Sequence, residues 1–330
     1  MQGAASAQLP LDVEAGEAHS DASMKDIDRQ LDAARGGVLL QPAPELGTLG
    51  VRGPDRQRWL NGLVTCDLAP LAPGQGAFGL SVAKNGKIQA ELWIVLTEDA
   101  ILVGLNRDRA AAMRDALDRY LIMEDAEIHD LSAEYAWLLA HGPRAGDLLE
   151  PGRRAGGFAA AIDRTGLGGA AFVTPAVGLS ALQAELTASA GAHGAMATPE
   201  GWGALCVEQG LGRFGVDFDE QNYPQEASIE RLAVSFKKGC YLGQETVYML
   251  EVRGHVKKKL VKLLVEGDSA IAAGAEIHAP DGSVVGAVTS SHRRAHQAMA
   301  LGYVKYKLTA PGTELRVAGR AARVAEAGPT

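Results

Sequence analysis

The sequence contains few cysteines, and their number and spacing exclude several kinds of site. Only Cys66, Cys206 and Cys240 occur in the 330 residues, far apart and without a Cys-x-x-Cys pair. An odd number of isolated thiols is typical of a protein kept in a reducing cytosol, and it provides neither a disulfide framework nor zinc- or cluster-ligand spacing. The histidines have no metal-ligating partner at useful spacing either, so we expect no resident metal.

Long apolar runs and an excess of positive charge are also lacking. No stretch approaches the roughly 20 apolar residues that a membrane-spanning helix needs. The beginning of the chain lacks the basic start and the apolar core of a secretory signal. The net charge of −8 argues against indiscriminate nucleic-acid binding. We therefore expect a cytoplasmic protein that does not associate with membranes.

The first 23 residues contain four acidic residues and no lysine or arginine, and they are rich in alanine, glycine and serine. This composition, which has no apolar period, predicts a disordered N-terminal extension over residues 1–23. The chain as a whole is too long for one typical domain. Its strand and helix patterns lack a strand followed by Gly-x-Gly-x-x-Gly, so they predict an α+β fold and no dinucleotide-binding unit.

Local patterns predict several individual elements. The dipeptide Asn85-Gly86 separates two strand-like segments and predicts an antiparallel hairpin. Residues 179–190 have the pattern of a helix, whereas residues 151–161 are rich in glycine and alanine and predict a loop.

The pattern changes past residue 256. Short strands then recur at roughly 8–12-residue spacing, with glycine and proline turns between them, which favours a small antiparallel barrel or sandwich. We therefore divide the chain into the extension 1–23, an α+β region 24–256 and a C-terminal β domain 257–330.

The most informative stretch surrounds Cys240 and reads Lys-Gly-Cys-Tyr-Leu-Gly-Gln-Glu over residues 238–245. Gly239 and Gly243 permit a tight turn, and a helix that begins near Gln244 would direct its free N–H groups back towards the thiol. Together with the neighbouring lysines, these surroundings favour a thiolate that can act as nucleophile, redox centre or metal ligand. The alternative is a buried structural thiol, which is what we expect of Cys66 and Cys206 in their apolar contexts.

These eight residues resemble the K-G-C-Y-x-G-Q-E motif of the YgfZ-like branch of the folate-binding T-protein superfamily. That superfamily includes the aminomethyltransferase, or T-protein, of the glycine cleavage system. Four further blocks match the superfamily in the same order along the chain: residues 53–68, 207–219, 223–227 and 286–290.

The resemblance implies a folate-binding T-protein-like fold, in which antiparallel sheets with helices form two intertwined α+β subdomains and a small β-barrel follows. It also implies a tetrahydrofolate-binding accessory protein that acts in iron–sulfur cluster assembly or repair of client enzymes. Cys240 would be its working residue, with a transient iron–sulfur cluster as a further expectation. The supporting motif residues are Lys238, Gly239, Tyr241, Gly243, Gln244 and Glu245.

Three residues become folate-binding candidates through the resemblance: Glu208, Glu91 and Arg253. Glu208 takes the position whose carboxylate hydrogen-bonds the pterin ring in relatives, although by itself it is equally a solvated helix glutamate. Arg253 opens a basic stretch that could attract the glutamate tail of folate or an RNA phosphate, or simply face solvent. Arg213 and Asp217 are alternatively structural partners in the same loop.

One departure from the T-protein pattern concerns the first hairpin. The T-protein has paired aspartates there, whereas this chain has Ala90 and Glu91. Alanine cannot transfer a proton or stabilise a developing cation, so aminomethyl transfer is not expected. Two alternatives stay open: a folate-dependent one-carbon transferase of the aminomethyltransferase type, and a folate- or tRNA-binding module involved in tRNA modification.

Overall fold

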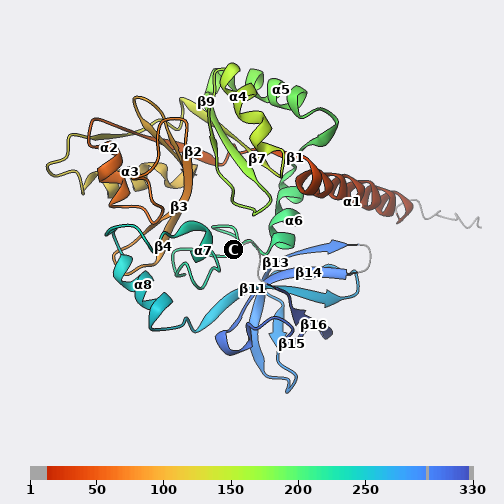
Figure 1. Cartoon of the computed structure of the whole chain (residues 1–330). Helices are drawn as coiled ribbons and strands as arrows, with labels where there is room; N and C mark the ends of the chain where they lie inside the picture. The colour runs from red at the N-terminus through yellow and green to blue at the C-terminus, as the bar shows by residue number, and fades with distance from the viewer. Residues whose placement is uncertain (1–12, 295–296, 327–330) are drawn as a thin grey trace, which may run out of the picture.

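The computed structural model describes residues 13–294 and 297–326, with side chains described from residue 24 onward. It contains two five-stranded sheets and a closed six-stranded barrel. Figure 1 shows the barrel at the C-terminal end of the chain, below the two sheets and their covering helices. The expected α+β fold with a small C-terminal antiparallel barrel is thus confirmed.

The first sheet has the strand order β3-β4-β5-β2-β6, and its paired strands are antiparallel. Apolar residues of α2 and α3 cover one face of this sheet, because their buried side chains join those of β2, β4 and β5 in one core cluster. The bounds are β2 Leu46–Arg52, β3 Gly76–Val82, β4 Ile88–Leu96, β5 Ile101–Asn106, β6 Glu127–Asp130, α2 Arg56–Asn61 and α3 Ala110–Asp118.

The second sheet has the order β10-β1-β7-β9-β8, and only the pair β1–β10 is parallel. Helices α4 and α5 pack on its outer face, whereas α1 and α6 share a separate cluster beside β1 and β10. The bounds are α1 Val13–Gly36, β1 Val38–Pro42, β7 Tyr135–His141, α4 Leu149–Arg154, β8 Phe158–Ala161, β9 Gly169–Pro175, α5 Leu179–Ala190, β10 Gly194–Met196 and α6 Pro199–Gln209.

The inner faces of the two sheets meet in the largest core cluster, which joins Phe78 and Trp93 of the first sheet to Trp137 and Val173 of the second. The chain then passes through α7 (Glu230–Ala233) and α8 (Gln244–Val252) before it enters the barrel. None of the helices in the described ranges is both long enough and apolar enough to cross a membrane.

The barrel closes in the order β11-β14-β13-β12-β15-β16 around its own apolar core. Its first strand begins at residue 258, directly after the segment that follows α8. The bounds are β11 Lys258–Glu266, β12 Glu276–His278, β13 Val284–Arg294, β14 Gln297–Lys305, β15 Glu314–Val317 and β16 Arg320–Val324.

Two segments differ from the sequence-based expectations. Helix α1 includes residues 13–23, whereas the composition predicts a disordered extension there. The segment is helical because its alanine and glutamate residues are strong helix formers. Residues 1–12 of the same extension lie outside the described residues. Residues 151–161, expected as a loop, form most of α4 and all of β8. The hairpin at Asn85-Gly86 is confirmed, because β3 and β4 pair in antiparallel register.

Candidate functional site

A cavity of about 220 Å³, here called the central cavity, lies where β4, β7, α6 and the loop after α6 meet. Its walls combine aromatic rings with two carboxylates and two guanidinium groups. The residues that carry these groups are Trp93, Trp202, Phe214, Glu45, Glu91, Arg164 and Arg213.

The only carboxylate of β4, that of Glu91, is held by a buried arginine. Nε and Nη2 of Arg164 donate hydrogen bonds to Oε1 of Glu91 over 3.2 and 2.5 Å, and Nη2 also donates to the carbonyl oxygen of Gly212 over 2.6 Å. The Arg164 residue is only 2% exposed. Burial alone would lower the pKa of Arg164, but the charge of Glu91 leaves this pKa above its usual value. Arg164 therefore remains charged.

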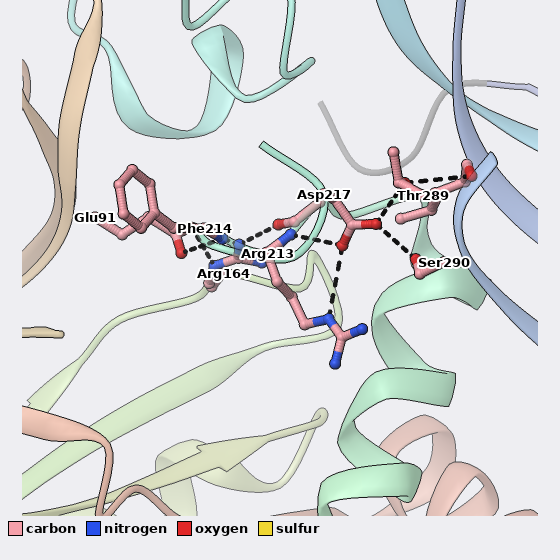
Figure 2. Close-up of polar contacts among 9 residues, drawn as sticks. Glu91, Arg164, Arg213, Phe214, Asp217, Thr289 and Ser290 are labelled. Carbon is pink, nitrogen blue, oxygen red and sulfur yellow. Dashed lines mark hydrogen bonds and ion pairs between the residues drawn. The ribbon is translucent and has the colours of Figure 1, made fainter. Parts of the chain in front are cut away.

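The loop after α6 connects the central cavity to the barrel (Figure 2). The backbone N–H of Phe214 donates to Oε2 of Glu91 over 3.3 Å. The buried carboxylate of Asp217 accepts the backbone N–H of Arg213 on Oδ2, and on Oδ1 it accepts hydrogen bonds of 2.6 Å from the hydroxyls of Thr289 and Ser290 in β13. Arg213 and Asp217 are thus structural partners within one loop.

The central cavity continues past Trp202 and Arg213 into a shallower depression of about 410 Å³. The Trp202 ring is fixed by stacking on His141, with ring centroids 4.5 Å apart, and His141 Nε2 hydrogen-bonds Oε1 of Gln41. Burial lowers the pKa of His141 to about 3, so its imidazole is neutral at physiological pH. A flat aromatic ligand with N–H donors would fit the rings and the Glu91 carboxylate, while Arg213 and Glu45 both line the opening into the depression.

Ala90 and Glu91 point to opposite faces of β4, as neighbouring strand residues must. The Ala90 side chain lies in the core cluster beneath α2 and α3, although the residue borders the central cavity. Glu91 is therefore the residue of this pair whose side chain offers a polar group to the cavity. An acidic side chain at position 90 would lie in the apolar core instead.

Glu208 lies on α6, and its buried carboxylate is bound by two arginines outside the central cavity. Arg35 of α1 donates to Oε2, and Nε of Arg294 in β13 lies 3.0 Å from Oε1. This arrangement joins α1, α6 and the barrel. Neither Glu208 nor Arg253, which is exposed after α8, belongs to the residues that line the central cavity.

The segment around Cys240 is fixed on both sides while the cysteine itself is exposed. Tyr241 is buried in the main core, and the backbone N–H of Leu242 donates to the carbonyl oxygen of Gly62 over 3.0 Å. Gly243 has φ +78°, and a Cβ there would lie 2.3 Å from the carbonyl oxygen of Ala83. Glycine is therefore required where the motif packs on the β3–β4 hairpin, directly before α8 begins at Gln244.

Lys238 does not direct its ammonium group to the Cys240 thiol, although the sequence predicts that it favours the thiolate there. Its Nζ donates hydrogen bonds of 2.6–2.9 Å to Oδ1 and the backbone oxygen of Asn61 and to the backbone oxygens of Val64 and Cys66. Burial lowers the pKa of Lys238 to about 8, so the ammonium still carries its proton at pH 7. This lysine fastens the motif to the segment after α2, and the exposed Lys237 is the remaining cation beside Cys240.

The sequence-predicted residues therefore lie in four places, one of which is the exposed end of α8 with Arg253. Cys240 and its supporting residues lie together in the segment that leads into α8. Gln244 is half-buried and Glu245 is exposed on the first turn of that helix. Glu91 lies in the central cavity, and Glu208 lies between α1 and the barrel. None of the motif residues 238–245 is among those that line the central cavity.

Sequence reasoning missed Arg164, Trp93, Trp202 and Phe214. Arg164 lies in the loop between two short strands, directly after Asp163, whereas its partner Glu91 is 73 residues away. Asp163 accepts backbone N–H groups of the same loop instead, so nothing local identifies Arg164 as part of a site. Within residues 24–294 and 297–326, whose side chains the structure describes, we find no group of three or more histidine, cysteine or acidic side chains placed to hold a metal ion.

We expect Cys240 to be alkylated well before Cys66 and Cys206 in the folded protein. The other two thiols are buried, and burial raises the pKa of each to about 12, so they remain protonated at pH 8. Mass spectrometry of a timed iodoacetamide reaction measures the order. A urea-unfolded control should label all three thiols at similar rates, and slower labelling of Cys240 than of the other two would contradict the prediction.

We expect Lys238→Met to lower the free energy of unfolding by about 2–4 kcal/mol. The change removes the ammonium while keeping most of the apolar stem, and it leaves buried carbonyl oxygens without a donor, each at a cost of about 1–3 kcal/mol. Urea denaturation followed by circular dichroism gives the value, with the exposed neighbour Lys237→Met as the matched control. Equal stability of the two variants would show that the four hydrogen bonds contribute little.

Two family models match this chain. One, described as the GCVT N-terminal domain, matches residues 7–157, and the other, the glycine cleavage T-protein C-terminal barrel domain, matches residues 258–327.

Known proteins are similar over most of the chain. The aminomethyltransferase of Rubrobacter xylanophilus is 28% identical over 286 residues, which cover 80% of this chain and 74% of that protein. The tRNA-modifying protein YgfZ of Edwardsiella ictaluri is 30% identical over 229 residues, which cover 64% of this chain and 66% of that protein. The crystal structure of aminomethyltransferase T of the glycine cleavage system from Bartonella henselae shares the fold, with a TM-score of 0.75 and 21% identity over 91% of this chain and 88% of that one.

Proposed function

The chain belongs to the glycine cleavage T-protein superfamily, and from that membership we propose that it is a tetrahydrofolate-binding accessory protein for the assembly or repair of iron–sulfur clusters in client enzymes. The observation that carries the folate part is the Glu91 carboxylate, fixed by Arg164 within a cavity walled by aromatic rings. Cys240 is the residue to which we assign the assembly or repair of clusters in client enzymes.

The groups of the central cavity suit a reduced folate. A pterin ring is flat and carries N–H donors along one edge, so it can pack against the rings of Trp93, Trp202 or Phe214 while donating to Glu91. Each carboxylate oxygen has two acceptor sites, so after the two bonds from Arg164 to Oε1 and the one from Phe214 to Oε2, Oε2 of Glu91 can accept one further N–H from the pterin. Arg213, where the cavity opens into the depression, supplies a cation for a carboxylate of the folate tail. Tetrahydrofolate, when bound, supplies the capacity to carry a one-carbon unit.

Cys240 presents a thiol at the surface on a segment that is anchored on both sides. A single cysteine can provide one thiolate ligand, whereas a cluster in a protein is held by several. A cluster handled here would therefore be cargo that shares ligands with a client or assembly protein. This is the arrangement that we propose for transfer or repair.

A second candidate function is aminomethyl transfer, which the similarity to aminomethyltransferases over 80% of the chain favours. A general base must accept a proton from the substrate, and both oxygens of the Glu91 carboxylate already accept hydrogen bonds from Arg164 and the backbone N–H of Phe214. We therefore place this function below the first. A reconstituted glycine-cleavage assay with the lipoyl carrier separates the two, because turnover is expected only for a transferase. The similarity to a tRNA-modifying protein makes tRNA a further candidate partner. Direct measurement of tRNA binding by the protein in the absence of folate tests this.

Calorimetry with tetrahydrofolate should show saturable binding by the unmodified protein. We expect Glu91→Gln to weaken it by about 1.5–3 kcal/mol, the range for a hydrogen bond to a charged group. Phe214→Leu, which keeps the ion pair intact, should weaken it by about 0.5–1.5 kcal/mol through loss of ring contact. Thermal melts of each variant establish that it is folded at the temperature of the titration.

Glu208→Gln is the informative comparison, because its carboxylate is engaged by Arg35 and Arg294 outside the central cavity. Nearly unchanged affinity in this variant would assign the pterin to Glu91. Selective loss in Glu208→Gln would assign it to the position expected from the superfamily pattern. Absence of saturable binding by the unmodified protein would remove the folate proposal altogether.

A further inference from the structure

A second cavity, of about 190 Å³, lies between the barrel and the segment that joins α6 to α7. We call it the interdomain cavity. We propose that it binds a small aliphatic α-amino acid, whose ammonium group pairs with Glu230 and whose carboxylate pairs with Lys262. The two walls come from different parts of the chain: α7 supplies Glu230, and β11 supplies Lys262.

Glu230 carries the first part of the argument. The residue is 5% exposed, and its Oε1 accepts a hydrogen bond of 2.8 Å from Nζ of Lys259. Its Oε2 is buried and has no hydrogen-bonding partner among the described residues. A buried anionic oxygen without a donor is costly, so a donor is expected at this position. An ammonium group satisfies both the charge and the hydrogen bond.

The cationic part of the cavity lies on β11. Nζ of Lys262 donates to the backbone oxygen of Glu208 over 2.9 Å, which leaves two of its three hydrogens for another acceptor. Arg231 also lines the cavity and is exposed. Three cationic residues and one acidic residue thus line the cavity, and Lys259 is already paired with the carboxylate of Glu230. The carboxylates of Glu208 and Glu326 also act on Lys262, but Glu208 is itself paired with Arg35 and Arg294. The remaining positive charge favours a carboxylate on the ligand.

The rest of the lining is apolar, and the volume is small. Leu211, Leu232, Leu260 and Val261 contribute walls without charge. The cavity is smaller than the roughly 300–1,000 Å³ of sites for drug-sized ligands. An α-amino acid with a short aliphatic side chain matches the Glu230 carboxylate, the Lys262 ammonium and the apolar wall of the cavity. A simple anion would leave Oε2 of Glu230 without a donor.

Ser228 gives the wall between these groups a fixed shape. It is one of two non-glycine residues in the described chain with positive φ, at 55°, and its hydroxyl donates to the backbone oxygen of Leu260 over 2.6 Å. A non-glycine residue in this conformation is strained and persists only where its surroundings hold it. Ser228 is itself among the residues that line the cavity.

The test is an amide NMR titration of the full chain with L-alanine, acetate and methylamine. We expect L-alanine to shift the amides of cavity residues such as Gly210 and Lys259 saturably, at least tenfold more tightly than either acetate or methylamine. Glu230→Gln and Lys262→Met should each weaken L-alanine binding at least tenfold. Lys257→Met, a change of an exposed lysine that does not line the cavity, should leave it unchanged.

A further variant keeps the test decisive if Glu230→Gln unfolds the protein. Ala325→Leu fills part of the cavity without touching the Glu230–Lys259 pair, and we expect it to abolish the L-alanine response. The proposal is overturned if L-alanine gives no saturable shifts, if acetate binds as tightly, or if Ala325→Leu leaves the response intact. None of these results depends on whether folate binds in the central cavity.

Discussion

Arg164→Met is expected to lower the free energy of unfolding by about 3–5 kcal/mol, which is the cost of breaking a buried ion pair by removing one partner. The Glu91 carboxylate would remain between the two sheets without its cation, and the carbonyl oxygen of Gly212 would lose its donor. The methionine side chain has a similar length, so little of this cost would come from an empty cavity. A loss of this size is a large part of the stability of an ordinary domain.

Chemical denaturation of four proteins measures this coupling: the unmodified chain, each single variant, and Arg164→Met combined with Glu91→Leu. Because the double variant removes both charges, it should recover a substantial part of the stability lost by Arg164→Met alone. The exposed pair of Arg144 and Asp147 provides a control, since Arg144→Met should cost less than about 1 kcal/mol. A similarly small cost for Arg164→Met would show that Glu91 is adequately solvated without the guanidinium group.

Cys240→Ser is expected to abolish the support of iron–sulfur enzymes in cells while leaving the protein folded. The side chain is exposed, so the substitution should change the free energy of unfolding by no more than about 0.5 kcal/mol. Serine keeps the size of the thiol but cannot supply a thiolate at neutral pH. The measurement is the activity of iron–sulfur enzymes in cells whose only copy carries the variant.

Two matched controls separate chemistry from folding in that experiment. Lys257→Met alters an exposed lysine outside the Cys240 motif and should retain most of the activity. Cys66→Ser alters a buried thiol, so any loss there should follow the amount of folded protein in the cell. Full enzyme activity with Cys240→Ser, or unfolding of that variant, would remove Cys240 from the proposed function.

Much of the fold was predictable from local patterns. The β3–β4 hairpin follows from Asn85-Gly86, and α5 has the bounds that its pattern predicts. The prediction of a loop over residues 151–161 was wrong, because the small side chains of this segment allow a helix and a strand to pack closely against the sheet. A Cβ at Gly152 of α4 would lie 2.5 Å from the ring of Phe172 in β9, so glycine there permits close contact between helix and sheet. Such a requirement depends on a partner that is distant in the sequence.

The site was less predictable, because its charges are paired by the tertiary structure. The exposure of Cys240 and the burial of Cys66 and Cys206 agree with their sequence contexts. The direction of Lys238 could not be predicted, since neighbouring residues of a turn can point to opposite sides and its acceptors lie more than 170 residues away. For the same reason Glu91 could be named from the superfamily pattern, but its arginine partner could not.

The hydrogen bonds from Thr289 and Ser290 to Asp217 have a consequence for how the protein matures. Asp217 leaves the ribosome 72 residues before Thr289 does, an interval of about 4–14 s at typical rates of synthesis. Until β13 is made, the loop that carries Arg213 and Phe214 lacks its attachment to the barrel. A nascent chain can therefore pair its two sheets early, yet the loop at the central cavity is attached to the barrel only when translation is nearly complete.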